Sequence, residues 1–140
     1  MKTQAIYGIV SNGEAKLTFT DTEGWPDCQG RKILELIHGF SDELLRFLFS
    51  RLSCVEDDTA DNQIDTLTGK IRLPNTLNSE YKYIINLDDG TLEYYCHNNI
   101  PRTKFSLKNI RNTPVEETVR IMNALDDNPK QMYDLFSLSA

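Results

Sequence analysis

The residues with the clearest capacity for chemistry are Trp25, Asp27 and Arg31, which lie close together around a Gly-Trp-Pro sequence. An indole beside the start of a helix, with a guanidinium one turn further on, could line a pocket for an anion or a small ligand. The other interpretation is structural: Trp25 would cover the core, Pro26 would stiffen the bend and Asp27 would cap the helix. We favour the structural interpretation, because tryptophan is highly buried on average.

The thiols and imidazoles predict no catalytic centre. Cys96 and His97 are adjacent, but neighbours in a strand point to opposite faces, so the imidazole would not reach the thiol as a base. Cys28 and His38 are equally badly spaced on one predicted helix. Together with Cys54, the cysteines are odd in number and contain no Cys-x-x-Cys pair. We therefore expect no disulfide framework, no metal and no cofactor, and lean towards a protein that is not an enzyme.

Charge is distributed unevenly along the chain, in which 21 acidic residues outnumber 15 basic ones and give a net charge of −6. Residues 56–65 hold a group of acids, namely Glu56, Asp57, Asp58, Asp61 and Asp65. Residues 99–112 contain no acid but several bases, namely Arg102, Lys104, Lys108 and Arg111. The acidic segment lacks the spacing of a calcium loop and predicts an exposed loop. Patches of opposite sign would steer a protein partner or allow self-association.

Two β-hairpins are predicted from turn residues and alternating side chains. The first joins residues 7–10 to 15–20 through Asn12-Gly13, and the second joins residues 81–87 to 91–96 through Asp88-Asp89-Gly90. Within residues 15–20, Lys16 and Thr18 are expected to face water.

Helical periodicity predicts three helices. The first lies within residues 27–40, the second begins after a Ser41 cap and includes residues 44–52, and the third runs from a capping box at Thr113 to Leu125;. In the second of these helices, one broad apolar face is predicted to contain Leu44, Leu45, Leu48, Phe49 and Leu52. A short strand is predicted at 105–107 and a terminal helix at 130–138. The order of elements predicts a single α+β domain over residues 1–140, an antiparallel β-sheet built from two hairpins with helices packed on one face.

Residues 1–55 resemble the N-terminal part of a group of small phage- and prophage-encoded proteins of uncharacterised function. The pattern of that group is a hairpin, a His-Trp-Asp-Gly-Tyr-Pro-like run, and a glycine that opens a leucine-rich helix. Its counterpart here is residues 22–34, in which Trp25-Pro26 is followed by Gly30. Thr22 and Glu23 stand near the places of the His and Asp. The resemblance implies a phage or mobile-element protein and assigns no activity.

These observations favour a non-enzymatic accessory protein that binds another protein, as an inhibitor or regulator of a host or defence component. The alternative is a small-ligand or nucleotide-binding domain, or a weak enzyme, with its site near Trp25; a homo-oligomeric structural protein is a third interpretation. The acidic balance argues against nucleic acid as a partner. The sequence contains no apolar run long enough to span a membrane and no signal-peptide pattern, so a cytoplasmic protein is expected.

Overall fold

The computed structural model describes residues 3–56, 69–74, 76 and 78–127 of the chain. Both predicted hairpins are confirmed. The first consists of β1 (Ala5–Ser11) and β2 (Glu14–Thr20), and the second of β5 (Tyr81–Asn86) and β6 (Thr91–Cys96). Asn12 and Gly13 turn the first hairpin with φ values of 54° and 76°, the left-handed conformation that an Asn-Gly turn favours;.

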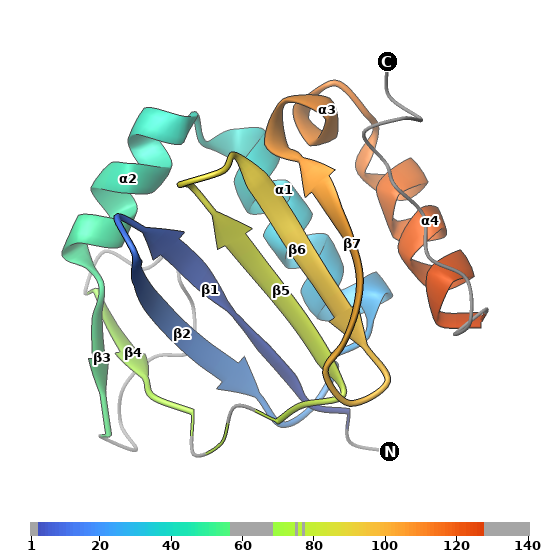
Figure 1. Ribbon diagram of the computed structural model, residues 1–140, viewed down its shortest axis with the longest axis horizontal. Coiled ribbons are helices and arrows are strands. Elements are labelled where there is room, and N and C mark those ends of the chain that lie inside the picture. Colours follow the sequence, from blue (N-terminus) through green and yellow to red (C-terminus); the bar gives the residue numbers. More distant parts are fainter. Residues whose placement is uncertain (1–2, 57–68, 75, 77, 128–140) are drawn as a thin grey trace.

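The main sheet has the strand order β2-β1-β5-β6-β7 (Figure 1). Strand β7 (Ile100–Ser106) extends the second hairpin and is longer than the strand predicted at 105–107. The α+β class is confirmed, but the purely antiparallel sheet is wrong at one junction: β1 and β5 pair in parallel. The reason is the long chain between the hairpins, which crosses over the sheet and returns β5 in the direction of β1.

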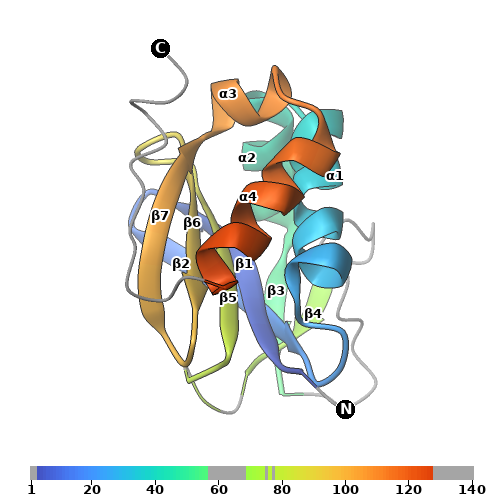
Figure 2. The ribbon, with the colours of Figure 1, turned by 90° about the vertical axis from the view of Figure 1, so that its right-hand side faces the viewer.

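The helices cover one face of this sheet, as predicted (Figure 2). A short π-helical segment (Pro26–Gly30) leads into α1 (Arg31–Gly39), which is followed by α2 (Asp42–Arg51), α3 (Leu107–Arg111) and α4 (Val115–Asp127). The Ser41 cap is confirmed, since its hydroxyl oxygen accepts a hydrogen bond from the Leu44 N–H at 3.2 Å. The terminal helix predicted at 130–138 lies outside the described residues.

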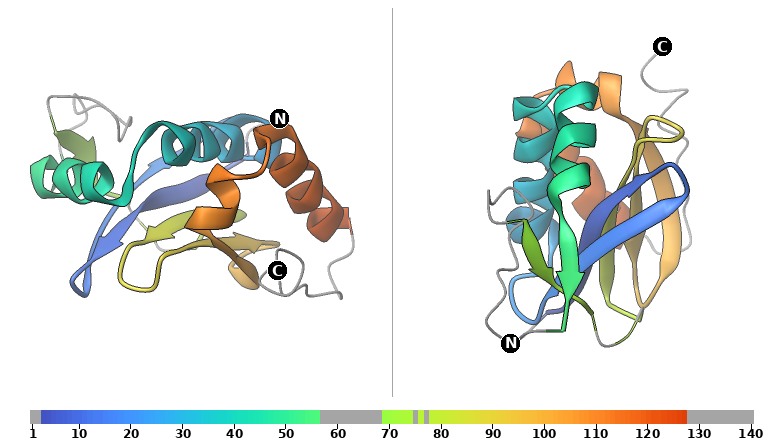
Figure 3. Two further views of the ribbon diagram at one scale, coloured as in Figure 1. Left: turned by 90° about the horizontal axis from the view of Figure 1, so that it is seen from above. Right: turned by 90° about the vertical axis from the view of Figure 1, so that its left-hand side faces the viewer.

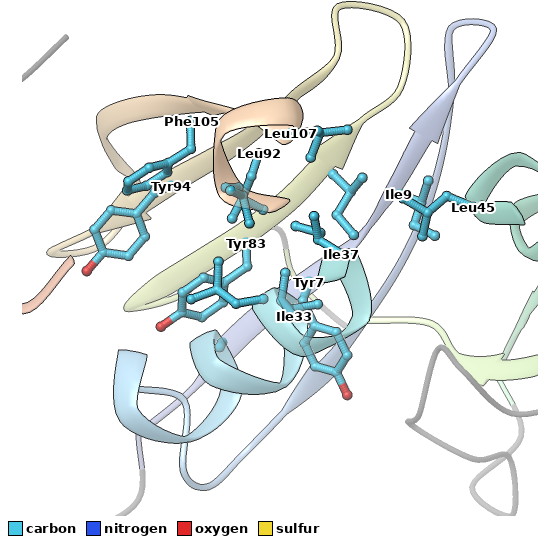
Figure 4. Close-up of a cluster of buried hydrophobic side chains, with 14 of the residues drawn as sticks. Tyr7, Ile9, Ile33, Ile37, Leu45, Tyr83, Leu92, Tyr94, Phe105 and Leu107 are labelled. Atoms are coloured by element: carbon cyan, nitrogen blue, oxygen red, sulfur yellow. The ribbon is translucent and has the colours of Figure 1, made fainter. Parts of the chain in front are cut away.

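The core lies between the sheet and α1, with α2 and α4 at its two sides (Figures 3 and 4). Tyr7 of β1 and Tyr83 of β5 point from the sheet towards Ile33 and Ile37 of α1, and all four side chains are buried. Ile9 of β1 lies beside Leu45 of α2 and is fully buried. The rings of Tyr83 and Tyr94 stack with centroids 5.7 Å apart. This arrangement follows from the two-residue period of the strands, which gives alternate side chains to the helical face.

Strand β2 is turned over relative to its predicted orientation. Lys16 and Thr18 lie on the helical side rather than in water: Lys16 Nζ donates to the Phe49 carbonyl at the end of α2 at 2.8 Å. Thr18 is fully buried, and its hydroxyl donates to the Arg72 carbonyl. The prediction is wrong because register with β1 decides the face, and β1 places Ile9 opposite Lys16;.

A small parallel pair, β3 (Ser53–Val55) and β4 (Lys70–Arg72), lies beside β2. The thiol of Cys54 lies 3.6 Å from the Leu17 carbonyl oxygen, and the Arg72 guanidinium lies 4.6 Å from the centre of the Phe19 ring. The pair therefore covers the outer side of β2.

The two hairpin turns lie at the same end of the sheet, because β1 and β5 run in the same direction. The carboxylate of Asp88 accepts hydrogen bonds from the backbone N–H groups of Asn12 at 2.7 Å and Gly13 at 2.9 Å. One side chain thus joins the two hairpins at a point where no ladder hydrogen bond does.

We expect Asp88→Ala to lower the free energy of unfolding by about 1–2 kcal/mol, because two backbone donors lose a charged acceptor. Urea denaturation with Asp21→Ala as the matched control measures this effect. Asp21 is an exposed aspartate near the end of β2. Equal stability of the two variants would contradict the role given to Asp88.

Candidate functional site

The outer side of α2 exposes two large apolar side chains. Leu44 is 52% exposed and Phe47 is 61% exposed, the highest values among the large hydrophobic residues of the described chain. They are three positions apart and therefore lie on the same side of the helix. The single broad apolar face predicted for α2 is thus wrong for Leu44.

The geometry of the helix explains why Leu44 is not buried. Leu45, Leu48 and Phe49 face the core and fill the side of α2 that the sheet can cover. Each residue advances about 100° around a helix, so Leu44 lies about 40° beyond Leu48, just outside that buried stripe. Phe47 lies further round still. Seen from above, α2 lies beyond the β1–β2 side of the sheet, with its outer side turned away from the molecule (Figure 3).

One arginine, Arg51, lies between Leu44 and Phe47 around the helix, whereas Arg46 lies nearly opposite Leu44;. Arg46 and Arg51 are both exposed, and the Arg51 guanidinium lies 5.9 Å from the centre of the Phe47 ring. We refer to Leu44, Phe47 and Arg51 as the α2 surface. Aromatic and arginine side chains are enriched in protein interfaces, whereas an isolated apolar side chain on a surface is ordinary. The signal in the sequence is Phe47, an aromatic residue that lies outside the predicted apolar face of the helix.

The Trp25 segment forms the corner between β2 and α1. Trp25 is half-buried and packs against the core. The Gly24 carbonyl accepts a hydrogen bond from the Tyr83 hydroxyl at 2.8 Å, and a Cβ atom on Gly30 would lie 3.1 Å from the Tyr83 ring. These contacts agree with the structural interpretation of the segment, in which close backbone approach fixes the bend.

The two charged residues of this segment have partners within the fold. Arg31 donates two hydrogen bonds to the carboxylate of Glu116 on α4, one of them at 3.1 Å. This contact lowers the pKa of the Glu116 carboxyl. Asp27 accepts a hydrogen bond from the Asn123 side chain at 3.2 Å. Asp27 is not the predicted helix cap, because Trp25 holds the cap position of the helical segment and Asp27 lies inside its first turn.

The predicted acidic patch falls mostly outside the described residues. Glu56 is exposed, whereas Asp57, Asp58, Asp61 and Asp65 are not described. The acidic loop therefore remains a prediction.

The predicted basic patch is wrong for two of its four residues. Arg102 is only 1% exposed, and its guanidinium donates to the Leu125 carbonyl at 3.3 Å. Arg111 is half-buried and donates to the carbonyls of Ile37 and Phe40 at the end of α1. Lys104 and Lys108 are exposed, and Lys104 lies 3.4 Å from the Asp89 carboxylate. Both arginines donate hydrogen bonds to backbone carbonyl groups at helix C-termini, which have no partner within the helix. The number of charges in a segment does not predict this role.

Cys96 and His97 do not point to opposite faces as expected. His97 has left β6 and has a φ of 52°, so its ring turns back towards the side of Cys96. The ring Nε2 lies 3.0 Å from the Oδ1 atom of Asp126 on α4, and donor atoms of Cys96, His97 and Asp126 lie within 4.8 Å of one another. The sequence signal was His-Asn-Asn, since these residue types enter the left-handed region more readily than most.

The electrostatics at Cys96 disfavour a nucleophile. The residue is fully buried, and burial together with the Asp126 charge raises the pKa of its thiol to about 11, although Arg102 acts in the opposite direction. A nucleophilic cysteine needs its thiolate form near neutral pH. The described residues therefore combine a histidine and a thiol here without activating the thiol.

A cavity of about 190 Å³ lies at the C-terminal end of β2. Its lining includes Ile6, Phe19, Asp21 and Ser79, and the Ser79 hydroxyl is buried without a hydrogen-bond partner among the described atoms. Neither Trp25 nor Arg31 lines this cavity. The predicted ligand site and the cavity are thus different places.

No protein-family model, curated protein sequence or solved structure matches the chain. Among the described helices, none has the length and apolar character needed to cross a lipid bilayer.

We expect the free energy of unfolding to fall as the pH rises above about 9. In the unfolded chain the Cys96 thiol loses its proton near pH 9, whereas in the folded protein it keeps the proton until about pH 11. The contribution is complete below the unfolded pKa and is lost through the folded pKa, with a slope of up to about 1.4 kcal/mol per pH unit. The buried phenols of Tyr83 and Tyr94, whose pKa values are also raised by burial, add to the loss at higher pH.

Urea denaturation between pH 7 and pH 11 measures this dependence. Cys96→Ala should reduce the slope between pH 9 and pH 10, below the range in which the phenols dominate, whereas Cys54→Ala, at a half-buried cysteine, should leave most of that slope. A wild-type stability that is constant over this range would contradict the proposed burial of the thiol.

Proposed function

We propose that this protein is a non-enzymatic accessory protein of a phage or another mobile element, and that it acts by binding a second protein as an inhibitor or regulator of a host or defence component. The α2 surface is the observation that carries the binding proposal. The phage or mobile-element origin rests on the resemblance of residues 22–34 to the phage-encoded group.

The composition of the α2 surface specifies the chemistry of its partner. Leu44 and Phe47 are suited to an apolar groove, and Arg51, which contacts the Phe47 ring, is suited to carboxylates at the rim of that groove;. We therefore propose a partner with an apolar groove rimmed by acidic residues.

The rigidity of α2 supports the same proposal. Its buried side is held by Leu45, Leu48 and Phe49, and its last turn accepts a hydrogen bond from Lys16. A helix that is already ordered loses little conformational entropy on binding, so more of the contact energy remains as affinity.

We expect Phe47→Glu to weaken partner binding by about 2 kcal/mol or more, roughly thirtyfold, while the melting temperature stays within a few degrees of wild type. The folded state should tolerate the change because Phe47 is mostly exposed. Immobilised protein would capture the partner from an extract of the natural host, and calorimetry with purified partner would measure the affinity. Ile100→Glu is the matched control, since Ile100 is 43% exposed on β7.

Three results would contradict the proposal. The first is no captured protein at physiological salt, and the second is equal affinity of the Phe47→Glu and Ile100→Glu variants. The third is light scattering that finds a wild-type dimer dissociated by Phe47→Glu, because the α2 surface would then be occupied by a second copy of the chain.

A small-ligand or nucleotide site at Trp25 is the weaker proposal, because the Arg31 guanidinium that would hold an anion is bonded to Glu116. A thermal-shift screen of nucleotides and common metabolites tests it. A true ligand at a hundred times its dissociation constant would add about 2.7 kcal/mol of stability, and Arg31→Ala should abolish that shift. We expect none of these compounds to change the melting temperature of the wild-type protein.

A further inference from the structure

Three side chains that commonly bind metals meet where β6 turns into β7. Cys96 ends β6, His97 begins the turn, and Asp126 lies in the last turn of α4. Their donor atoms lie within 4.8 Å of one another. This cluster lies on different elements from the α2 surface, and the function proposed above does not use it.

The backbone of the turn is what brings the imidazole to the thiol. His97, Asn98 and Asn99 follow one another with φ values of 52°, 61° and 74°, all in the left-handed region. Such a run is uncommon for residues other than glycine, and each residue adds conformational cost. The Asn99 side chain donates to the Asn78 side chain at 2.6 Å, which helps to hold the turn.

We propose that Cys96, His97 and Asp126 form a binding site for one divalent transition-metal ion of the zinc class. Thiolate sulfur, imidazole nitrogen and carboxylate oxygen are the three donor types that Zn²⁺ binds in proteins. Three protein ligands leave a fourth tetrahedral position. His97 and Asp126 have side chains that are 39% and 26% exposed, so that position faces solvent while Cys96 lies beneath.

The distances require only a small adjustment. Tetrahedral bonds of about 2.0–2.3 Å place neighbouring donor atoms roughly 3.3–3.8 Å apart. The His97 nitrogen and the Asp126 oxygen would separate slightly from 3.0 Å, and the widest pair would close from at most 4.8 Å. The His97 Nε2 atom also lies 2.8 Å from the Asp126 carbonyl oxygen. When this nitrogen coordinates the ion, its hydrogen bonds to Asp126 are replaced by the metal bond.

The surroundings supply charge balance and orientation. On binding, the Cys96 thiol releases its proton to solvent, and the resulting thiolate and the Asp126 carboxylate together neutralise a divalent ion. The Tyr81 hydroxyl donates to Asp126 Oδ2 at 2.6 Å, which leaves Oδ1 directed at the cluster. Outer contacts of this kind orient metal ligands in characterised sites. The Arg102 guanidinium is bonded to the Leu125 carbonyl and lies close enough to favour the thiolate.

Cobalt(II) is the probe, because its absorption reports both geometry and ligand type. We expect one Co²⁺ per chain by native mass spectrometry, with visible bands of a four-coordinate ion and a near-ultraviolet band from thiolate-to-metal charge transfer. Zn²⁺ should displace Co²⁺, remove the bands and raise the melting temperature with increasing concentration.

The variants separate ligands from bystanders. Cys96→Ser should remove the near-ultraviolet band, and His97→Asn and Asp126→Asn should each lower the affinity by more than the ten- to hundredfold typical of an outer contact. Tyr81→Phe should cost roughly ten- to hundredfold. Cys54→Ser, His38→Asn and Asp127→Asn make the same chemical changes outside the cluster and should leave binding unchanged. His97 and Asp126 are partly exposed, so their variants should fold even if Cys96→Ser does not.

Several results would overturn the site: no Co²⁺ bands at millimolar metal, a thiolate band that persists in Cys96→Ser, or wild-type affinity in both His97→Asn and Asp126→Asn. Loss of binding in the control variants to the same degree would also overturn it, because the ion would then be held elsewhere.

Discussion

β1 and β5 run side by side in the same direction, with Tyr7 opposite Tyr83 and Ile9 opposite Ile85, and this parallel pair fixes where the other elements lie. After β1 the chain returns along β2, and β5 then pairs on the other side of β1, so the segment between β2 and β5 must pass over β1; α1 and α2 lie in that segment, on one face of the sheet (Figure 2). The same pairing puts both hairpin turns at one end of the sheet. The turn that follows β6 must then lie at the opposite end, beside the last turn of α4.

The sequence predicts those parts of the fold that local patterns determine. Asn12-Gly13 and Asp88-Asp89-Gly90 mark their turns because left-handed backbone is needed there, and Ser41 marks the start of α2 because it can satisfy a free N–H;. The parallel pairing of β1 with β5 joins segments that are far apart in the chain, and no local pattern in either strand predicts it. The orientation of β2 could not be predicted for the same reason. Lys16 and Thr18 are polar, and only the register with β1 places them on the helical side of the sheet.

The candidate sites divide along similar lines. That Trp25 belongs to a corner of the core could be predicted from its type and its neighbours, and its half-burial agrees with this. The exposure of Phe47 depends on how far α2 lies beyond the sheet, a tertiary property. The cluster at His97 depends on a single backbone choice. Continued as a strand, the chain would have separated His97 from Cys96; the left-handed turn brings them to one side. Arg102 differs in the opposite direction: its charge predicts a surface position, but the side chain is buried in the fold.

The covering of β2 by the small β3–β4 pair has a consequence for the behaviour of the protein at high concentration. β2 and β7 are the outer strands of the main sheet, and open outer strands are templates for aggregation;. Thr18 and Leu17 of β2 already contact β4 and β3, whereas β7 contains Pro101, which has no N–H to offer, and the exposed cation of Lys104. Neither outer strand offers an uninterrupted template to a strand from another molecule. A protein protected in this way can display apolar side chains on a helix without that display leading to fibril growth through its backbone.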